Sequence, residues 1–404
     1  VMKYFEEKSA KNALEGKPPI VKRKCEIERI AEGCIDIRRT TGQHPGGIVV
    51  LPIGEEIHSF TPVQHPANDM TTSIVTTHFD YHSIDHNLLK LDILGHLDPT
   101  MIRMLQDLTG IDPLEIPLDS KEVMSLFQNT SALGIKPEDI GGTKLGALGI
   151  PEFGTDFAMQ MLMDTKPQYF SDLVRIAGLA HGTDVWLGNA QTLIKEGKAT
   201  ISTAICTRDD IMIYLIQKGL DSEESFKIME MVRKGKVASG KCKEWPEWKQ
   251  DMIDHGVPDW YIWSCERIKY MFPKAHAAAY VMMAWRVAYC KVFYPLAYYT
   301  AYFSIRATAF DYEKMAMSPV RLEHYIAEYK AKKAEGTISN TEEDELGVMR
   351  IVQEMHARGY EFTPIDIYKA KARTFQIIDG KIMPSFKVIS KVGEVAGESI
   401  EIAA

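Results

Sequence analysis

The pattern of apolar residues changes along this chain from that of short strands to that of helices. Two strand candidates, residues 46–52 and 88–94, lie in the first quarter and are bounded by Gly or Pro. From about residue 120 onward the apolar residues recur at helical spacing. The sequence therefore predicts an α+β chain in which a small sheet precedes a mainly α-helical region.

Length and composition argue against several classes of protein. The chain has 404 residues, enough for two or more domains, and ordinary contents of hydrophobic (45%) and charged (25%) residues. No apolar run is long enough for a transmembrane helix, and the first residues lack the apolar core of a secretion signal. Six scattered cysteines, with no Cys-x-x-Cys pair, argue against a disulfide scaffold and a thiolate zinc site. We therefore expect a cytoplasmic protein, and the non-Met start indicates part of a longer one.

The net charge of −8 conceals a difference between regions of the chain. Residues 227–291 contain twelve Lys or Arg against seven Asp or Glu, a local net charge of 12 − 7 = +5. The rest of the chain therefore sums to −8 − 5 = −13. Local fields rather than totals attract phosphates, so this region is a candidate for nucleotide or nucleic-acid binding, although such differences also arise by chance.

The strand candidate at residues 88–94 carries a residue with metal-binding chemistry. Alternation places Lys90 and Asp92 on one face of the strand. The opposite face is wholly apolar and is predicted to lie in a core; it consists of Leu89, Leu91 and Ile93. A carboxylate fixed on a strand is a rigid ligand for Mg²⁺, which prefers oxygen donors. The alternative is a solvent-facing Asp beside a Lys on an edge strand.

Capping signals predict where several helices begin and end. Asp98 is the predicted N-cap of a helix with Pro at its first position, and Gly110 is its predicted end. Asp221 is the predicted N-cap of another helix, with a Glu three residues later as in a capping box. A long apolar helix is predicted over residues 276–293. The charged residues 330–344 indicate a surface linker or hairpin.

Seven of the twelve histidines lie in the first quarter of the chain. His78 and His82 are four residues apart, the spacing at which two zinc ligands of a hydrolase share one face of a helix. The residues around His78 do not have a helical pattern, which favours hydrogen-bonded or surface histidines and no zinc. A zinc-dependent hydrolase is the alternative for this region.

A basic segment comprises Arg233, Lys234 and Lys236. A planar guanidinium and two ammonium groups suit the binding of a triphosphate. The alternative is that these cations complement the dipole at the C-terminus of a helix.

A second segment, residues 271–280, combines aromatic side chains with small ones. A helix beginning after Pro273 brings His276 and Tyr280 onto one face, one turn apart. The alanines between them leave room for a flat group to lie against Tyr280. A tight helix–helix contact explains the alanines equally well.

Five strings in this sequence resemble signatures of one family. They are residues 38–47 (RRTTGQHPGG), 89–96 (LKLDILGH), 149–153 (GIPEF), 181–186 (HGTDVW) and 271–280 (MFPKAHAAAY). Their wording and order resemble the bacterial C-family DNA polymerases, and best the PolC type of DNA polymerase III alpha subunit. The resemblance covers roughly residues 38–386.

The resemblance implies a palm domain with a nucleotidyltransferase-type sheet and three aspartates that bind two Mg²⁺ ions. Asp92 matches the third of these aspartates, and is therefore the expected catalytic and metal-binding residue. The other two form an Asp-x-Asp motif in the family, and this sequence contains no such motif. One metal would lower the pKa of the primer 3′-hydroxyl, and the other would bind the triphosphate and stabilise the leaving pyrophosphate.

The resemblance also implies positions for the remaining site residues. Arg233 is expected to contact phosphate and Tyr280 to pack against the nucleotide. The residues expected at the nucleotide are Arg233, Lys234, Lys236, Phe272, Lys274, His276 and Tyr280. Those expected near the active site in the palm are Arg39, Gln43, His44 and Lys90.

The expected organisation has three parts: a palm portion (1–119), helical fingers (120–310) and a C-terminal part (311–404). The last part holds the end of the fingers and the start of a DNA-binding region. The expected function is template-directed DNA synthesis within a chromosomal replicase, with this chain alone inactive. A non-catalytic DNA-binding module derived from a polymerase is the alternative. Expected partners are primer–template DNA and dNTP, with the sliding clamp and other replisome subunits contacted by other segments, in the nucleoid and away from any membrane.

Overall fold

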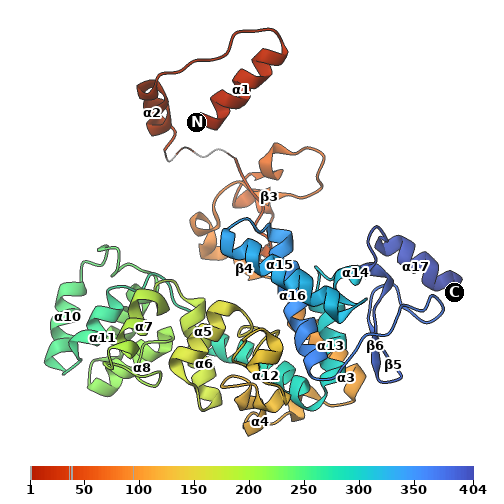
Figure 1. The fold of residues 1–404 in the computed structure, drawn as a ribbon. Helices are drawn as coiled ribbons and strands as arrows, with labels where there is room; N and C mark the ends of the chain where they lie inside the picture. Colours follow the sequence, from red (N-terminus) through yellow and green to blue (C-terminus); the bar gives the residue numbers. More distant parts are fainter. Residues whose placement is uncertain (1, 36, 38–39, 94) are drawn as a thin grey trace. The chain divides into compact units, whose positions relative to one another are not determined.

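The computed structural model describes residues 2–35, 37, 40–93 and 95–404, so Arg39 of the expected palm loop lies outside the described residues. The chain divides into two compact units, Val1–Gly95 and His96–Ala404, and each is described by itself (Figure 1). By expected role, the sequence divides the chain into residues 1–119, 120–310 and 311–404. That division stays a prediction.

The N-terminal unit contains two helices followed by two small sheets. The helices are α1 (Met2–Leu14) and α2 (Lys24–Gly33), and the strands are β1 (Gly47–Val50), β2 (Val63–Gln64), β3 (Thr76–Thr77) and β4 (Leu89–Asp92). Strand β1 pairs antiparallel with β4, and β2 pairs antiparallel with β3. Both strands predicted from the sequence are therefore confirmed, and Asp92 is the last residue of β4, opposite Gly47.

The predicted burial of the apolar face of β4 is wrong. Leu89, Leu91 and Ile93 are 59%, 44% and 61% exposed. Their cross-strand neighbours Ile48 and Val50 are exposed on the same face. Alternation only sorts side chains onto two faces, whereas burial needs a second layer, and the described residues of this unit place none over this two-stranded sheet.

The regular elements of the C-terminal unit are mainly helices. Its helices of seven or more residues are α3 (Leu97–Thr109), α5 (Asp156–Thr165), α6 (Phe170–His181), α8 (Arg208–Lys218), α9 (Ser222–Arg233), α10 (Trp245–Asp254), α11 (Asp259–Cys265), α12 (Lys274–Phe293), α13 (Pro295–Ala301), α15 (Pro319–Glu335), α16 (Asn340–Ala357) and α17 (Glu394–Ala403). Shorter helices are α4 (Lys121–Ser125), α7 (Gln191–Lys195) and α14 (Tyr312–Met315), and β5 (Gln376–Ile378) pairs with β6 (Lys381–Met383). The expected α+β class with a dominant helical region is confirmed. None of the helices in the described ranges is long and apolar enough to span a membrane.

Helix α12 is the centre of the C-terminal unit, and it packs against α6, α3 and α13 (Figure 1). Trp285 on this helix is fully buried, its ring stacks on Phe127, and its Nε1 donates a hydrogen bond to the Pro117 carbonyl at 2.8 Å. The predicted helix over residues 276–293 is confirmed. Its alanines serve packing in part, since Ala277 is completely buried.

One predicted helix boundary needs correction, and the structure decides between the two alternatives for residues 330–344. The N-cap of α3 is His96 rather than Asp98, because the His96 Nδ1 accepts the backbone N–H of Asp98 at 3.3 Å. Of the two alternatives for residues 330–344, the structure has a hairpin rather than a linker: the end of α15, a short connection and the start of α16, two helices that pack together. Ion pairs between these helices, such as Lys332–Glu342 at 2.7 Å, give the charged residues partners that a sequence pattern does not reveal.

A buried ion pair joins α12 to α16 and to the loop before residue 149. The Lys291 Nζ lies 2.8 Å from Glu354 Oε1, and neither side chain is exposed. The same Nζ donates hydrogen bonds to the carbonyl oxygens of Gly146 (2.8 Å) and Leu148 (2.5 Å). The Tyr299 hydroxyl donates to Glu354 at 2.7 Å. The ammonium of α12 therefore has acceptors on two other segments that are far apart in sequence, residues 146–148 and α16.

We expect Lys291→Met to weaken this region strongly, because it leaves the Glu354 carboxylate buried without its cation. The free energy of local opening of residues 146–154 should fall by about 3–5 kcal/mol. Native-state hydrogen exchange of the complete protein measures this quantity for the corresponding peptides. The matched control is Lys333→Met, which removes the exposed Lys333–Glu343 pair and should change opening by less than about 1 kcal/mol. Equal, small effects of the two substitutions would contradict the role given to Lys291.

Candidate nucleotide site and strand carboxylate

Backbone hydrogen bonds join the segments that carry the expected nucleotide-binding residues. The Met271 N–H donates to the Arg233 carbonyl at 3.2 Å, and the Arg208 N–H donates to the Phe272 carbonyl at 3.1 Å. Gly235 has φ +68, and a Cβ at this position would lie 2.5 Å from the Lys269 carbonyl oxygen. A side chain at residue 235 would therefore push the end of α9 away from residues 269–272.

The basic turn at the end of α9 is held by a carboxylate of the same helix. Glu230 forms a two-bond ion pair with Arg233, in which Nη2 to Oε2 measures 2.8 Å. The Lys234 Nζ lies 3.0 Å from Glu230, and the Arg208 Nη1 lies 4.0 Å from it. The hydrogen bond from Arg233 is the main cause that lowers the pKa of Glu230 to about 2. Lys236 is exposed at the following turn.

The aromatic side chains expected at the nucleotide form one group along the first turns of α12. The rings of Phe272 and His276 are stacked with centroids 4.9 Å apart, and those of His276 and Tyr280 are 4.6 Å apart. The predicted single face for His276 and Tyr280 is confirmed. Lys274 is exposed at the start of the helix, where its backbone N–H donates to the Asp209 carboxylate at 2.6 Å.

His181, the last residue of α6, supports this aromatic group. Its ring centroid lies 5.7 Å from that of Phe272, 5.4 Å from that of His276 and 5.8 Å from that of Tyr280. Burial, followed by the charge of His181, lowers the pKa of His276 below its usual value. His276 is therefore held in its neutral form to a lower pH than an exposed histidine.

Glu152 fixes the position of His181. A hydrogen bond of 2.7 Å joins the His181 Nε2 to the Glu152 carboxylate, and this bond lowers the pKa of Glu152. Glu152 has φ +67, a left-handed backbone conformation that is unfavourable for a residue with a Cβ. Its neighbours Ile150 and Phe153 are almost completely buried and hold the loop in this conformation.

Three side chains near this loop have the composition of a metal site. The ligand atoms of His96, Asp98 and Glu152 lie within 4.8 Å of one another. However, the Arg306 guanidinium forms an ion pair with the buried Asp98 carboxylate. Burial raises the pKa of Asp98, and the positive charge of Arg306 opposes that change. The Arg306 guanidinium therefore already supplies the cation beside Asp98, and the three side chains do not fit a metal ion.

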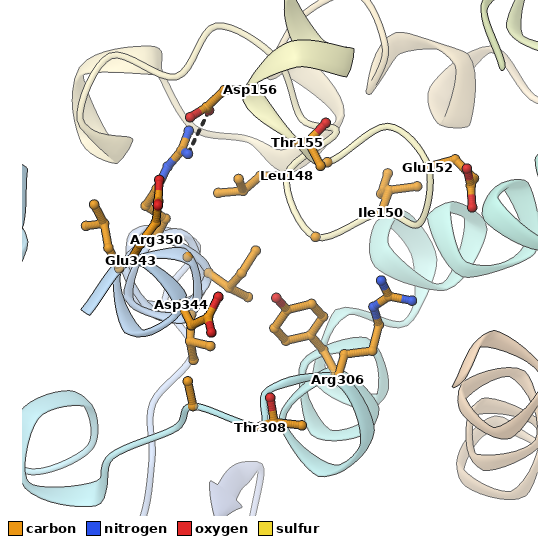
Figure 2. Close-up of a pocket in the computed structure, with 18 of the residues that line it drawn as sticks. Leu148, Ile150, Glu152, Thr155, Asp156, Arg306, Thr308, Glu343, Asp344 and Arg350 are labelled. Carbon is orange, nitrogen blue, oxygen red and sulfur yellow. Dashed lines mark hydrogen bonds and ion pairs between the residues drawn. The ribbon is translucent and has the colours of Figure 1, made fainter. Parts of the chain in front are cut away.

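A cavity of about 480 Å³ borders the loop that carries Glu152. Its wall consists of residues 148–156, residues 302–309 and the beginning of α16, and Glu152 and Arg306 lie at one side of it (Figure 2). Figure 2 also shows the ion pair between Arg350 and Asp156, which measures 2.8 Å. This pair ties α16 to α5 across the cavity. None of the expected nucleotide-binding residues lines it.

In the N-terminal unit, the carboxylate of Asp92 is half exposed at the end of β4. The Lys90 Nζ lies 3.5 Å from it and the His44 Nε2 lies 3.8 Å from it. The His44 Nδ1 accepts the backbone N–H of Gly47 at 2.6 Å, so a proton on this ring is placed at Nε2, toward Asp92. A Cβ on Gly47 would lie 2.7 Å from the His44 Nδ1, so a side chain at this position would displace the His44 ring.

Other residues expected in this region have simpler surroundings. Gln43 is exposed. His78 follows β3 and lies 2.7 Å from the Gln64 side chain, while His82 lies in a single 3₁₀ turn. The predicted absence of a helix around His78 is confirmed, so the i, i+4 spacing does not place these two histidines as a zinc pair.

Sequence reasoning gave no role to Glu230, Arg208, Glu152 and His181, which hold the expected residues in place. The spacing of Glu230 from Arg233 and Lys234 is a local helical signal that could have identified it. Arg208 and the Glu152–His181 pair meet the site only through contacts between distant segments, for which the sequence has no local signal.

Comparison with known proteins identifies both units. Residues 1–95 match the family model described as bacterial DNA polymerase III alpha NTPase domain, and residues 98–256 match the bacterial DNA polymerase III alpha subunit finger domain. The break between the two models coincides with the division of the structure after Gly95.

Curated relatives match nearly the whole chain. It is 50% identical over 400 residues to the DNA polymerase III PolC-type of Caldanaerobacter subterraneus subsp. tengcongensis, which is 99% of this chain and 27% of the relative. It is 53% identical over 381 residues to the DNA polymerase III PolC-type of Streptococcus suis, which is 94% of this chain and 26% of the relative. The chain thus spans about a quarter of the length of these relatives. Its sequence, its two units and these matches show that the chain belongs to the bacterial DNA polymerase III alpha family of PolC type.

Proposed function

We propose that this chain is the part of a replicative DNA polymerase that carries one metal-binding aspartate and binds the incoming dNTP. The reaction is template-directed nucleotidyl transfer from a dNTP to a primer 3′-hydroxyl. The observation that carries the proposal is the convergence of the basic turn of α9, residues 269–274 and Arg208 in one place. Cations and stacked rings on one surface are what a nucleotide triphosphate requires.

Asp92 is proposed as a ligand of the catalytic Mg²⁺ ions. Its half-exposed carboxylate on a strand, paired only loosely with Lys90 and His44, fits an oxygen-preferring cation. When bound, two Mg²⁺ ions would activate the primer 3′-hydroxyl and offset the charge on the leaving pyrophosphate. The sequence contains no Asp-x-Asp motif, so the other two carboxylates must come from outside this chain. We therefore expect the chain alone to be inactive.

In the C-terminal unit, Arg233 is proposed to bind phosphate oxygens, with Lys234, Lys236 and Lys274 adding positive charge. The rings of His276 and Tyr280 are proposed to lie against the incoming base, and Phe272 supports them. Stacking needs a flat, weakly charged surface, and the lowered pKa of His276 keeps that ring neutral. Tyr280 is partly exposed, as a ring that packs against a bound nucleotide must be.

The proposed organisation places a palm portion at residues 1–119, fingers at 120–310 and the following region at 311–404. In this arrangement β1 and β4 belong to a nucleotidyltransferase-type palm sheet. Primer–template DNA and dNTP are the proposed direct partners. The sliding clamp and other replisome subunits are contacted by parts of the protein outside this chain, in the cytoplasm at the nucleoid.

Primer extension by the complete protein tests the role of Asp92. We expect Asp92→Ala to lower kcat/KM by at least about 10³-fold while DNA binding is retained, because a metal ligand is lost. Asp85→Ala is the matched control, since Asp85 is another partly exposed carboxylate of this unit that pairs with histidines. Activity of Asp92→Ala within a few-fold of wild type would remove Asp92 from the metal site. Activity unchanged together with salt-sensitive DNA binding would favour a non-catalytic DNA-binding module.

The pH dependence of nucleotide binding tests the role of neutral His276. Protonation would place a charge in the aromatic group, so the KM for dNTP should rise as the pH falls toward and below the pKa of His276. Because that pKa lies below the usual 6.5, the rise should begin below about pH 6.5 rather than above it. His276→Gln should flatten the profile between about pH 8 and pH 5.5. His324→Gln, which alters an exposed histidine of α15, should keep the wild-type profile; a profile unchanged in His276→Gln would contradict the proposal.

A further inference from the structure

The basic turn at the end of α9 contains a carboxylate that the proposed phosphate contacts leave unexplained. Glu230 lies three residues before Arg233 and four before Lys234, so the three side chains share one face of the helix. Its carboxylate contacts Arg233 through two hydrogen bonds, Lys234 at 3.0 Å and Arg208 of α8 at 4.0 Å. One acidic side chain therefore gathers three cations from two helices.

This arrangement is more than a surface ion pair. Only 18% of the Glu230 side chain and 20% of the Arg233 side chain are exposed, whereas Lys234 is 49% exposed. Pairs with two hydrogen bonds between guanidinium and carboxylate fix the plane of the guanidinium as well as its position. The Arg233 side chain is therefore held in one orientation, and Lys234 keeps access to solvent.

Two roles for a carboxylate at a phosphate site have opposite consequences. It can compete with phosphate for the cations, or it can hold the cations ready for phosphate. The atoms involved favour the second role. A guanidinium has five N–H donors, and Glu230 engages Nε and Nη2 of Arg233, so this ion pair does not use Nη1. Three cations against one carboxylate also leave a net charge of 3 − 1 = +2.

The backbone around the ion pair supports this role. The Arg233 carbonyl is bonded to residue 271 and the Arg208 N–H to residue 272, so both cations are anchored to the segment that leads into α12. The Glu230 carboxylate in turn contacts the side chains of both cations. Removing the carboxylate would release the side chains and leave the backbone contacts intact.

We propose that Glu230 is a positioning residue for the triphosphate of the incoming nucleotide, which it serves by orienting Arg233, Lys234 and Arg208. This inference rests on the proposed function, because it takes the basic turn as the phosphate site. A triphosphate then meets cations that are already oriented, and its binding does not require the ion pair to break. The carboxylate itself touches neither the nucleotide nor the reacting atoms.

Steady-state primer extension by the complete protein, with Glu230→Gln and Glu230→Ala, tests the inference. The KM for dNTP should rise about 10-fold in both variants, while kcat stays within about three-fold of wild type, because ground-state binding is lost. The inhibition constant of inorganic tripolyphosphate, added as its Mg²⁺ complex, should rise in parallel. That second readout isolates the phosphate contacts from those of the base.

The matched control is Glu223→Ala on the same helix. Glu223 is 76% exposed and pairs with Lys227 at 2.7 Å, away from the basic turn, so KM and kcat should be unchanged. Glu230→Gln keeps the size of the side chain and decides the result if the alanine variant melts at a lower temperature than wild type.

Several outcomes would overturn the inference. A KM below that of wild type would mean that Glu230 competes with phosphate, and an unchanged KM would mean that it serves only the helix. A KM that rises without a change in tripolyphosphate inhibition would place its effect away from the phosphates. Failure of the proposed function is distinct, since in that case the wild-type complete protein would not extend primers at all.

Discussion

The buried ion pair between Lys291 and Glu354 is the interaction on which the candidate site depends most. Burial lowers the pKa of Lys291, and the Glu354 carboxylate opposes that change, so the charge persists only while its acceptors stay in place. Two of those acceptors are carbonyl oxygens of the segment directly before residues 149–154. Helices α12 and α16 therefore fix the loop that carries Glu152, and through Glu152 they fix His181 beside the aromatic group.

The packing that fixes this loop also explains why an unfavourable backbone conformation is tolerated at Glu152. Glu152 adopts a left-handed conformation that costs of order 1 kcal/mol or more, and it persists because buried neighbours on either side leave the loop no alternative. The result is a carboxylate directed at His181 rather than into solvent. Rigid packing on one side of the loop thus determines the position of a ring on the other side.

A feature of the fold or of the candidate site could be predicted from the sequence when it depends on contacts within one helix or strand. It could not be predicted when it depends on contacts between distant segments. Periodicity predicted α12 and the shared face of His276 and Tyr280, because both follow from contacts within one helix. Alternation identified β4 and the position of Asp92, but it could not tell whether a second layer covers Leu89, which is 59% exposed. The N-cap of α3 was mistaken, and residues 330–344 stayed undecided between a linker and a hairpin, where side chains had partners outside their own segment. For the same reason, Arg208 and the Glu152–His181 pair had no signal in the sequence.

Prediction from charge has the same limit, because a count of basic residues does not show which of them pair with carboxylates. Residues 227–291 carry the local excess of basic residues, yet several of those cations pair with carboxylates away from the basic turn. Lys291 is buried against Glu354, Lys249 pairs with Glu266 at 2.7 Å, and Lys269 pairs with Asp184 at 2.7 Å. The cations at the basic turn are instead a few side chains that share one carboxylate, that of Glu230. A phosphate-binding surface built in this way depends less on the number of cations than on what prevents them from turning to other partners.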